Sequence, residues 1–215
     1  MLVQRAEEFA RLVHRNQFYG ERPYVNHLKE VYLTLLDFGV KDGIVLAAAW
    51  LLGSLEDTET TYNTLETQFG EEIADIVQRV TNKRGYSREQ ILEKTAPKVK
   101  KHYAALTIKL ADRIVNTEFS INNNLKLYQI YKDEFPKFKE LLYREEEKDE
   151  IILDLWKHLS KLYNPWVVLA GKYEDDPYYG EVLAHIEESR EELDEEVGRY
   201  YDDCYEIVEE RMYDQ

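Results

Sequence analysis

The chain has 215 residues and only one cysteine, Cys204. A single thiol excludes an intramolecular disulfide and suits a reducing compartment, so we expect a cytoplasmic protein. Long apolar runs are also missing, because none approaches the roughly 20 residues that a membrane-spanning helix needs. The amphipathic residues 1–7 lack the apolar stretch of a signal peptide. We therefore expect no contact with a membrane.

Positive charge is scarce, with 28 Lys and Arg residues against 43 Asp and Glu residues and a formal net charge of −15. This balance opposes direct binding to nucleic acid or to an anionic membrane surface. The acidic excess is concentrated in residues 172–215, which hold 17 acidic and 4 basic side chains, a net of −13. Residues 1–171 are nearly neutral, so we expect the two parts of the chain to have different roles.

The sequence also has no glycine-rich phosphate loop, no serine or cysteine nucleophile motif and no cysteine–histidine cluster. Its apolar residues recur with the period of a helix, and they do not alternate with polar residues as they would in strands. We predict an all-α fold with helices at about 3–18, 26–39, 43–55, 60–69, 71–81, 103–118, 123–134, 135–145 and 148–163. The helix at 43–55 is apolar almost all round and should be central. Ala96-Pro97 should interrupt a helical stretch.

We predict two domains, a helical domain at 1–163 and an appendage at 164–215. The appendage begins with a short connector and continues as an acidic, tyrosine-rich amphipathic helix with one apolar seam. Three arrangements of this appendage are open. Its apolar seam packs on the helical domain, or the seam pairs with a second copy of the chain to form a homodimer. In the third arrangement, the acidic face binds a basic protein partner or imitates nucleic acid.

Short motifs in a fixed order point to a known family. They are His14-Arg15-Asn16-Gln17, Pro23-Tyr24-Val25-Asn26-His27, Glu56-Asp57-Thr58, Phe69-Gly70, Ala96-Pro97 and Lys109-Leu110-Ala111-Asp112-Arg113. Over about residues 3–163 the chain resembles the HD-domain small alarmone (ppGpp) hydrolases and the hydrolase domains of RelA and SpoT. The resemblance implies an all-α HD fold. It also implies a family activity that removes the 3′-pyrophosphate from ppGpp with bound Mn²⁺.

The resemblance implies a metal site with four ligands, of which this sequence keeps two. His27 stands at the place of the first histidine and Asp112 at that of the last aspartate. Leu52 and Gly53 replace the central His-Asp pair, and neither side chain can bind a metal. We therefore interpret His27 and Asp112 as vestigial ligands and expect no cofactor. Mn²⁺ would bind only if other ligands rescued the site.

Glu56 and Asp57 stand where the family has a carboxylate pair beside the attacking water. On one continuous helix, Leu52 and Glu56 are four residues apart, as are Gly53 and Asp57. Both carboxylates would then lie on the face of the lost ligands, and a displaced metal site stays open as an alternative. If the protein is active, Glu56 and Asp57 are its candidate catalytic residues. Otherwise they are a helix-end pair bonded to nearby backbone.

The resemblance also implies a cleft for a guanine nucleotide or a related small molecule. Its candidate residues are Arg15, Asn16, Tyr24, Arg88, Lys109, Arg113 and Asn116. Glu89 stands where the family has a lysine, and a carboxylate there would repel a pyrophosphate. We favour a degenerate HD-domain protein that acts by binding in a regulatory role. The alternatives are an active metal-dependent nucleotide pyrophosphohydrolase with an altered metal site, and an acidic inhibitor or nucleic-acid mimic that acts through residues 172–215.

Overall fold

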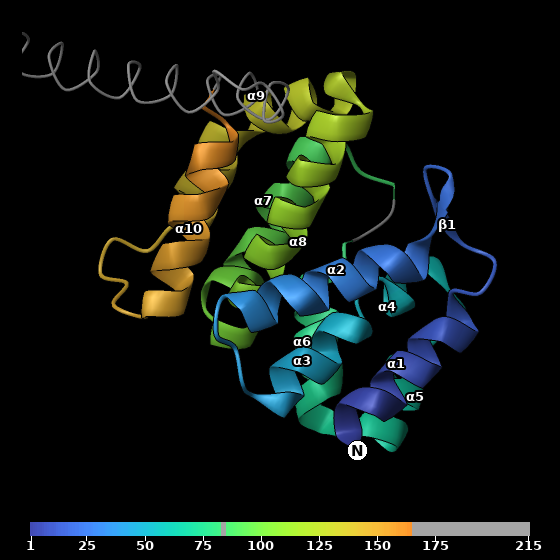
Figure 1. Cartoon of the computed structure of the whole chain (residues 1–215). Helices are drawn as coiled ribbons and strands as arrows, with labels where there is room; N and C mark the ends of the chain where they lie inside the picture. The colour runs from blue at the N-terminus through green and yellow to red at the C-terminus, as the bar shows by residue number, and fades with distance from the viewer. Residues whose placement is uncertain (83–84, 165–215) are drawn as a thin grey trace, which may run out of the picture. The chain divides into compact units, whose positions relative to one another are not determined.

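Helices dominate the computed structural model, which describes residues 1–82 and 85–164 (Figure 1). The elements are α1 (Leu2–Val13), β1 (Phe18–Tyr19), β2 (Arg22–Pro23), α2 (Tyr24–Asp37), α3 (Gly43–Trp50), α4 (Ser54–Asp57), α5 (Tyr62–Phe69), α6 (Glu71–Val80), α7 (Arg88–Lys100), α8 (Tyr103–Asn123), α9 (Leu125–Leu142) and α10 (Glu150–Leu162). The two short strands pair antiparallel as a hairpin. The prediction of an all-α fold is confirmed for this part of the chain.

Residues 1–164 form one compact unit. The predicted appendage, apart from Asn164, lies outside the described residues. The domain boundary at 163 and the three arrangements of the acidic segment therefore stay predictions.

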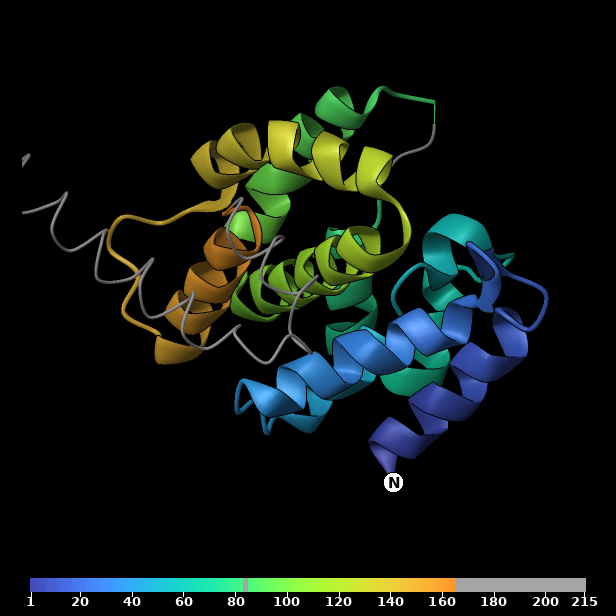
Figure 2. The same cartoon turned by 45° about the horizontal axis from the view of Figure 1, so that its top comes forward.

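Helix α8 runs through the middle of this unit and contacts α2, α6, α7, α9 and α10 (Figure 1, Figure 2). Its side chains Leu106, Ile108 and Ile114 are fully buried. Helix α3 is buried as its apolar sequence predicts, with Ala47 and Trp50 in the core. Because α8 is packed on several sides, the polar residues that it carries are held in fixed positions.

The predicted helix at 43–55 is wrong at its C-terminal end. Helix α3 ends at Trp50, and the separate short helix α4 begins at Ser54. Gly53 lies between them with φ +77°, in the left-handed region that residues with a Cβ atom rarely adopt. Leu52 and Glu56 are therefore not one turn apart on one helix. The reasoning that placed both carboxylates on the face of the lost ligands does not hold.

Proline interrupts neither of the helices that contain it. Pro97 lies inside α7, so Ala96-Pro97 is not a break. Pro136 lies inside α9, so the two helices predicted at 123–134 and 135–145 are one. A proline in a helix leaves the carbonyl group four residues earlier without its helical partner. Both prolines are exposed, so water can reach that carbonyl group and the helices continue.

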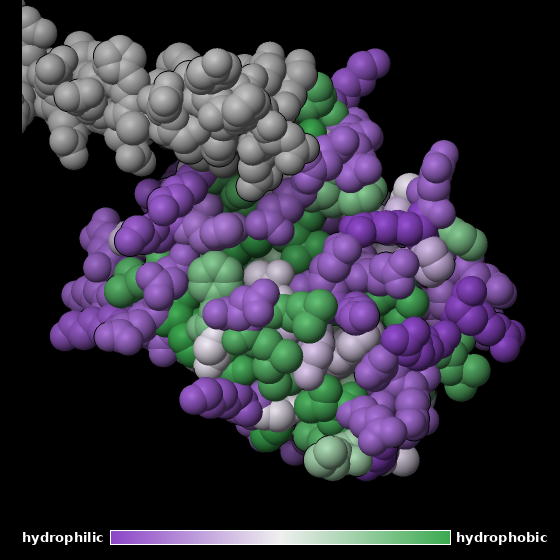
Figure 3. Space-filling model, viewed as in Figure 1, coloured by the Kyte–Doolittle hydropathy of each residue, from purple (hydrophilic) through white to green (hydrophobic). Residues whose placement is uncertain are grey.

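The surface follows from the amphipathic sequence of the helices. In Figure 3, polar side chains cover much of the visible face outside the grey atoms, and apolar side chains gather at its lower centre, over α2 and α3. Within residues 1–82 and 85–164, no helix combines the length and the apolar character needed to cross a membrane.

A capping box fixes the start of α7, the helix that carries Arg88. The Ser87 hydroxyl accepts from the N–H of Gln90, and the Gln90 side chain accepts from the N–H of Ser87. Replacing Ser87 with alanine is expected to lower the free energy of unfolding by about 1 kcal/mol, because a helix-end N–H loses its partner. Urea denaturation measures the change, with Ser87→Thr as the control that keeps a hydroxyl cap. Equal stability of Ser87→Ala and the wild type would contradict the expectation.

Candidate functional site

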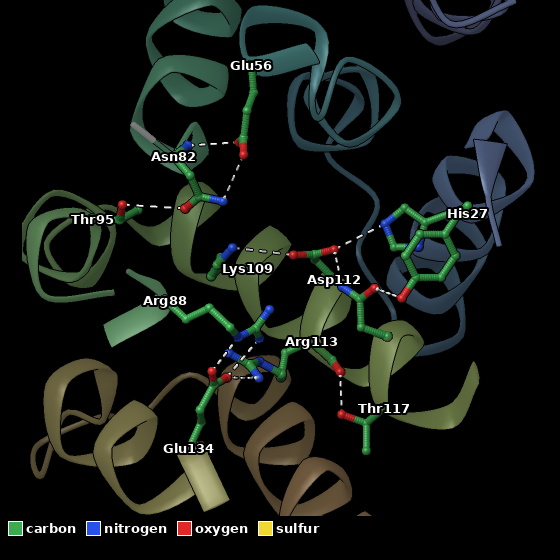
Figure 4. Close-up of polar contacts among 12 residues, drawn as sticks. His27, Glu56, Asn82, Arg88, Thr95, Lys109, Asp112, Arg113, Thr117 and Glu134 are labelled. Carbon is green, nitrogen blue, oxygen red and sulfur yellow. Dashed lines mark hydrogen bonds and ion pairs between the residues drawn. The ribbon is translucent and has the colours of Figure 1, made fainter. Parts of the chain in front are cut away.

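The two predicted metal ligands contact each other directly (Figure 4). His27 on α2 places Nε2 3.1 Å from Oδ1 of Asp112 on α8. Asn116, one turn along α8, donates from Nδ2 to the same oxygen at 2.8 Å. The other oxygen of Asp112 lies 3.4 Å from Lys109 Nζ. Tyr19 extends the network by donating its hydroxyl to Oδ1 of Asn116 at 2.7 Å.

Asp112 is held in its charged form. Burial by itself would raise the pKa of Asp112. The Lys109 ammonium, the hydrogen bond to His27 and the charge of Arg113 overcome that effect and hold the pKa well below its usual range. Lys109 and Arg113 stand three residues before and one residue after Asp112. The segment Lys-Leu-Ala-Asp-Arg therefore supplies the positive charge that its own buried carboxylate needs.

A tyrosine ring fills the space beside Gly53. A Cβ atom at Gly53 would lie 2.6 Å from the hydroxyl oxygen of Tyr24 and 3.2 Å from two carbons of its ring. The ring packs against His14 and His27, with centroid distances of 4.9 and 5.4 Å. Burial raises the pKa of Tyr24 well above its usual value, so the phenol stays neutral. Leu52 is buried and adds only apolar atoms.

These contacts decide whether the residues fit the divalent ion that the resemblance implies. Protein metal centres of this kind use at least three side-chain donors. Among the residues that the structure describes, no three His, Cys, Asp or Glu side chains are grouped so that they could hold an ion. Asp112 already accepts from an ammonium group, and Leu52 and the ring of Tyr24 occupy the region where further donors would be needed. The residues present do not fit the ion.

The predicted catalytic pair is split between two surfaces. Glu56 accepts the backbone N–H of Asn82 at 2.9 Å, and its other oxygen lies 3.4 Å from the side-chain amide of the same residue. Asp57 is exposed and accepts from Nε2 of Gln17 at 3.2 Å. Neighbouring helix residues point about 100° apart, which explains the separation. The two carboxylates therefore have different hydrogen-bond partners, and the charges of both help to raise the pKa of Tyr24.

A cavity of about 280 Å³ is enclosed by residues of α7, α8 and α9 and reaches Glu56. Four of the seven predicted nucleotide-binding residues line it, namely Arg88, Lys109, Arg113 and Asn116. Ile91 and Leu92 of α7 add apolar surface. The cavity thus combines three cationic groups and an apolar wall with three carboxylates, those of Glu56, Asp112 and Glu134.

The other three predicted nucleotide-binding residues lie elsewhere. Arg15 and Asn16 line a separate, open hollow together with Asp57. Helix α1 ends at Val13, before these residues, whereas the predicted helix extended to residue 18. Tyr24 packs among histidine rings and is not part of the cavity lining. These three residues therefore do not line the cavity, and their role in nucleotide binding stays a prediction.

Sequence reasoning missed Glu134, which lines the same cavity from α9. Its carboxylate accepts from Nε and Nη2 of Arg88 at 2.5 and 2.9 Å and from Nη1 of Arg113 at 3.1 Å (Figure 4). Burial alone would raise the pKa of Glu134, but the two arginines lower it. A sequence signal existed, because Glu134 stands three residues after Tyr131 and four before Phe138. That spacing places a carboxylate on the buried aromatic face of the helix.

Comparison with known proteins defines the class. Residues 6–129, which include His27 and Asp112, match the family model of the HD domain. A solved metazoan ortholog of SpoT that hydrolyzes ppGpp has a TM-score of 0.62 and 24% identity, covering 74% of this chain and 94% of its own. A Listeria monocytogenes structure has a TM-score of 0.53 and 22% identity, covering 66% of this chain and 98% of its own. Both similarities concern the fold.

Curated relatives narrow the class. The guanosine-3′,5′-bis(diphosphate) 3′-pyrophosphohydrolase of Aquifex aeolicus is 32% identical over 92% of this chain. MESH1 enzymes of the same name from Danio rerio and Xenopus tropicalis are 39% and 33% identical over 50% and 54% of this chain. The chain therefore belongs to the HD-domain family of ppGpp hydrolases, as its motifs predicted. The match spans 27% of the Aquifex protein, 63% of the Danio protein and 67% of the Xenopus protein.

Proposed function

We propose that this protein binds a guanine nucleotide that carries pyrophosphate, without a metal ion and without hydrolysing it. The observation that carries the proposal is the engagement of Asp112 with His27, Lys109 and Asn116. The polar groups at the family's metal position bond to one another, while the cavity that contains Arg88, Lys109 and Arg113 persists beside them. The substrate named for the relatives, guanosine-3′,5′-bis(diphosphate), supplies the ligand class.

The cavity holds three cationic side chains that suit such a ligand, each of them paired with a carboxylate in the structure. Arg88, Lys109 and Arg113 can form short, charge-assisted hydrogen bonds with phosphate oxygens. Ile91 and Leu92 offer apolar surface that a purine ring would cover. The volume of about 280 Å³ lies just below the range of small-molecule sites, which span roughly 300–1,000 Å³. We therefore expect side chains to move when the ligand enters.

Hydrolysis has no support from the acidic residues. A general base must reach the attacking water, and both oxygens of Glu56 face Asn82. Asp57 accepts a hydrogen bond from Gln17. We infer a binding protein in a regulatory role. A single cysteine fits a reducing, cytoplasmic location.

The test combines binding and turnover with ppGpp. Isothermal titration in EDTA should give saturable binding, and anion-exchange chromatography should show no product with or without Mn²⁺. Arg88→Gln is expected to weaken binding about tenfold, the effect of losing roughly 1.4 kcal/mol of charged hydrogen bonding. Lys137→Gln is the matched control, because Lys137 is on α9 but pairs with Glu140 at the surface.

Two results would redirect the proposal. Mn²⁺-dependent release of pyrophosphate that disappears in Glu56→Gln would support the alternative of a working hydrolase with an altered metal site. Absence of binding in the wild type would turn attention to the acidic segment 172–215 and to a basic protein partner. In that case, deletion of residues 172–215 from the otherwise intact chain should abolish the effect of the protein on that partner.

A further inference from the structure

Two arginines of the cavity already hold an anion that belongs to the protein itself. Arg88 contacts Glu134 with two of its nitrogens, in the forked geometry that matches a carboxylate or a phosphate. Arg113 contacts the same carboxylate from the next helix and shares its Oε2 atom with Arg88. One negative charge therefore lies between two positive charges, and all three groups line the cavity.

The arginines are held in place by contacts that do not involve Glu134. The ring of Tyr131 lies 5.2 Å from the guanidinium carbon of Arg88 and 4.8 Å from that of Arg113. Arg113 also lies 4.5 Å from the ring centroid of Phe138. Stacking on aromatic rings favours a fixed guanidinium orientation. The anion-binding geometry should therefore persist if the carboxylate of Glu134 moves away.

Glu134 also lies where an incoming anion can replace its carboxylate. Its side chain is 22% exposed and that of Arg88 is 53% exposed, whereas Arg113 is 11% exposed. The carboxylate can therefore move toward solvent without breaking the core, and an incoming anion can approach from the Arg88 side. A pyrophosphate group carries more negative charge than one carboxylate and offers more acceptor oxygens to two guanidinium groups.

We propose that Glu134 is an internal competitor that occupies the phosphate-binding position between Arg88 and Arg113, so that a pyrophosphate-bearing ligand binds by displacing it. This deepens the proposed function and rests on it for the identity of the nucleotide. The existence of the anion site does not depend on the identity of the nucleotide and can be tested with inorganic pyrophosphate. Glu134 then sets the affinity of the cavity, because every ligand must compete with a tethered carboxylate.

The test measures binding of inorganic pyrophosphate to the full chain by isothermal titration in EDTA. Glu134→Gln should bind pyrophosphate at least tenfold more tightly than the wild type, because the competing charge is gone. Adding Arg88→Gln to that variant should reverse the gain. Asp133→Asn is the matched control, since it removes the same charge from the adjacent, exposed position, where Asp133 accepts from Gln129 on the preceding turn.

Equal or weaker pyrophosphate binding by Glu134→Gln would overturn the proposal. If this variant does not fold, Glu134→Asp keeps the charge on a shorter side chain that cannot reach both arginines, and it should still bind pyrophosphate more tightly than the wild type. No gain in Glu134→Asp would overturn the proposal equally. A gain in pyrophosphate binding without any ppGpp binding would leave Glu134 as the competitor and refute the proposed nucleotide.

Discussion

Replacing Asp112 with alanine is expected to lower the free energy of unfolding by about 3–5 kcal/mol, the usual effect of removing one partner of a buried ion pair. The substitution leaves the Lys109 ammonium beside an empty site, with its side chain only 14% exposed. It also leaves Nε2 of His27 and Nδ2 of Asn116 without their acceptor. Urea denaturation of purified protein measures the loss from the shift of the unfolding midpoint.

Two further variants test the reason for that loss. Asp112→Asn keeps an acceptor oxygen but removes the charge, and we expect a smaller decrease of about 1–3 kcal/mol. Asp133→Ala removes an exposed carboxylate that is bonded to Gln129 on the next turn, and we expect a change within about 0.5 kcal/mol. If Asp112→Ala lost no more stability than Asp133→Ala, the network around Asp112 would not be holding α2 against α8.

Replacing Gly53 with alanine is expected to lower the free energy of unfolding by about 2–5 kcal/mol, from two effects. The left-handed backbone at φ +77° disfavours a Cβ atom by about 1–2 kcal/mol. Overlap with the Tyr24 ring adds about 1–3 kcal/mol, as overpacking does elsewhere. The ring cannot move freely, because it packs against His14 and His27. Thermal and urea denaturation measure the sum.

Gly39→Ala separates the two effects. Gly39 has φ +85°, and a Cβ atom there would meet nothing within 4 Å. We expect this variant to lose only the backbone part, about 1–2 kcal/mol. In a Tyr24→Ala background, the excess loss from Gly53→Ala should vanish. If the two glycine variants were equally destabilised in the wild-type background, the ring of Tyr24 would not be filling the space.

The same geometry bears on any attempt to rebuild the metal site. Leu52→His and Gly53→Asp together restore the family's His-Asp pair in sequence. The Cβ atom of the new aspartate would still lie 2.6 Å from the hydroxyl oxygen of Tyr24. We expect the double variant to bind Mn²⁺ only when Tyr24 is also replaced by a smaller residue.

The motifs predicted the family, the all-α fold and the proximity of His27 and Asp112. These features depend on residue identity and spacing, which the sequence displays directly. Helix boundaries were less predictable. Periodicity continued through Leu52 and Gly53, while the left-handed backbone at Gly53 ended the helix. The exposure of Pro97 and Pro136 allowed two helices to continue that a local rule would have ended.

The sequence by itself determined that the fold is helical and that Leu52 and Gly53 offer no metal-binding side chain, because helical periodicity and metal-binding capacity depend on side-chain chemistry. Only the tertiary structure decided what occupies the space around these two residues. The ring of Tyr24 reaches Gly53 across 29 positions of sequence, and Glu134 reaches Arg88 across 46. Such contacts depend on how α2, α7, α8 and α9 pack, and no local pattern specifies the distance between side chains on different helices.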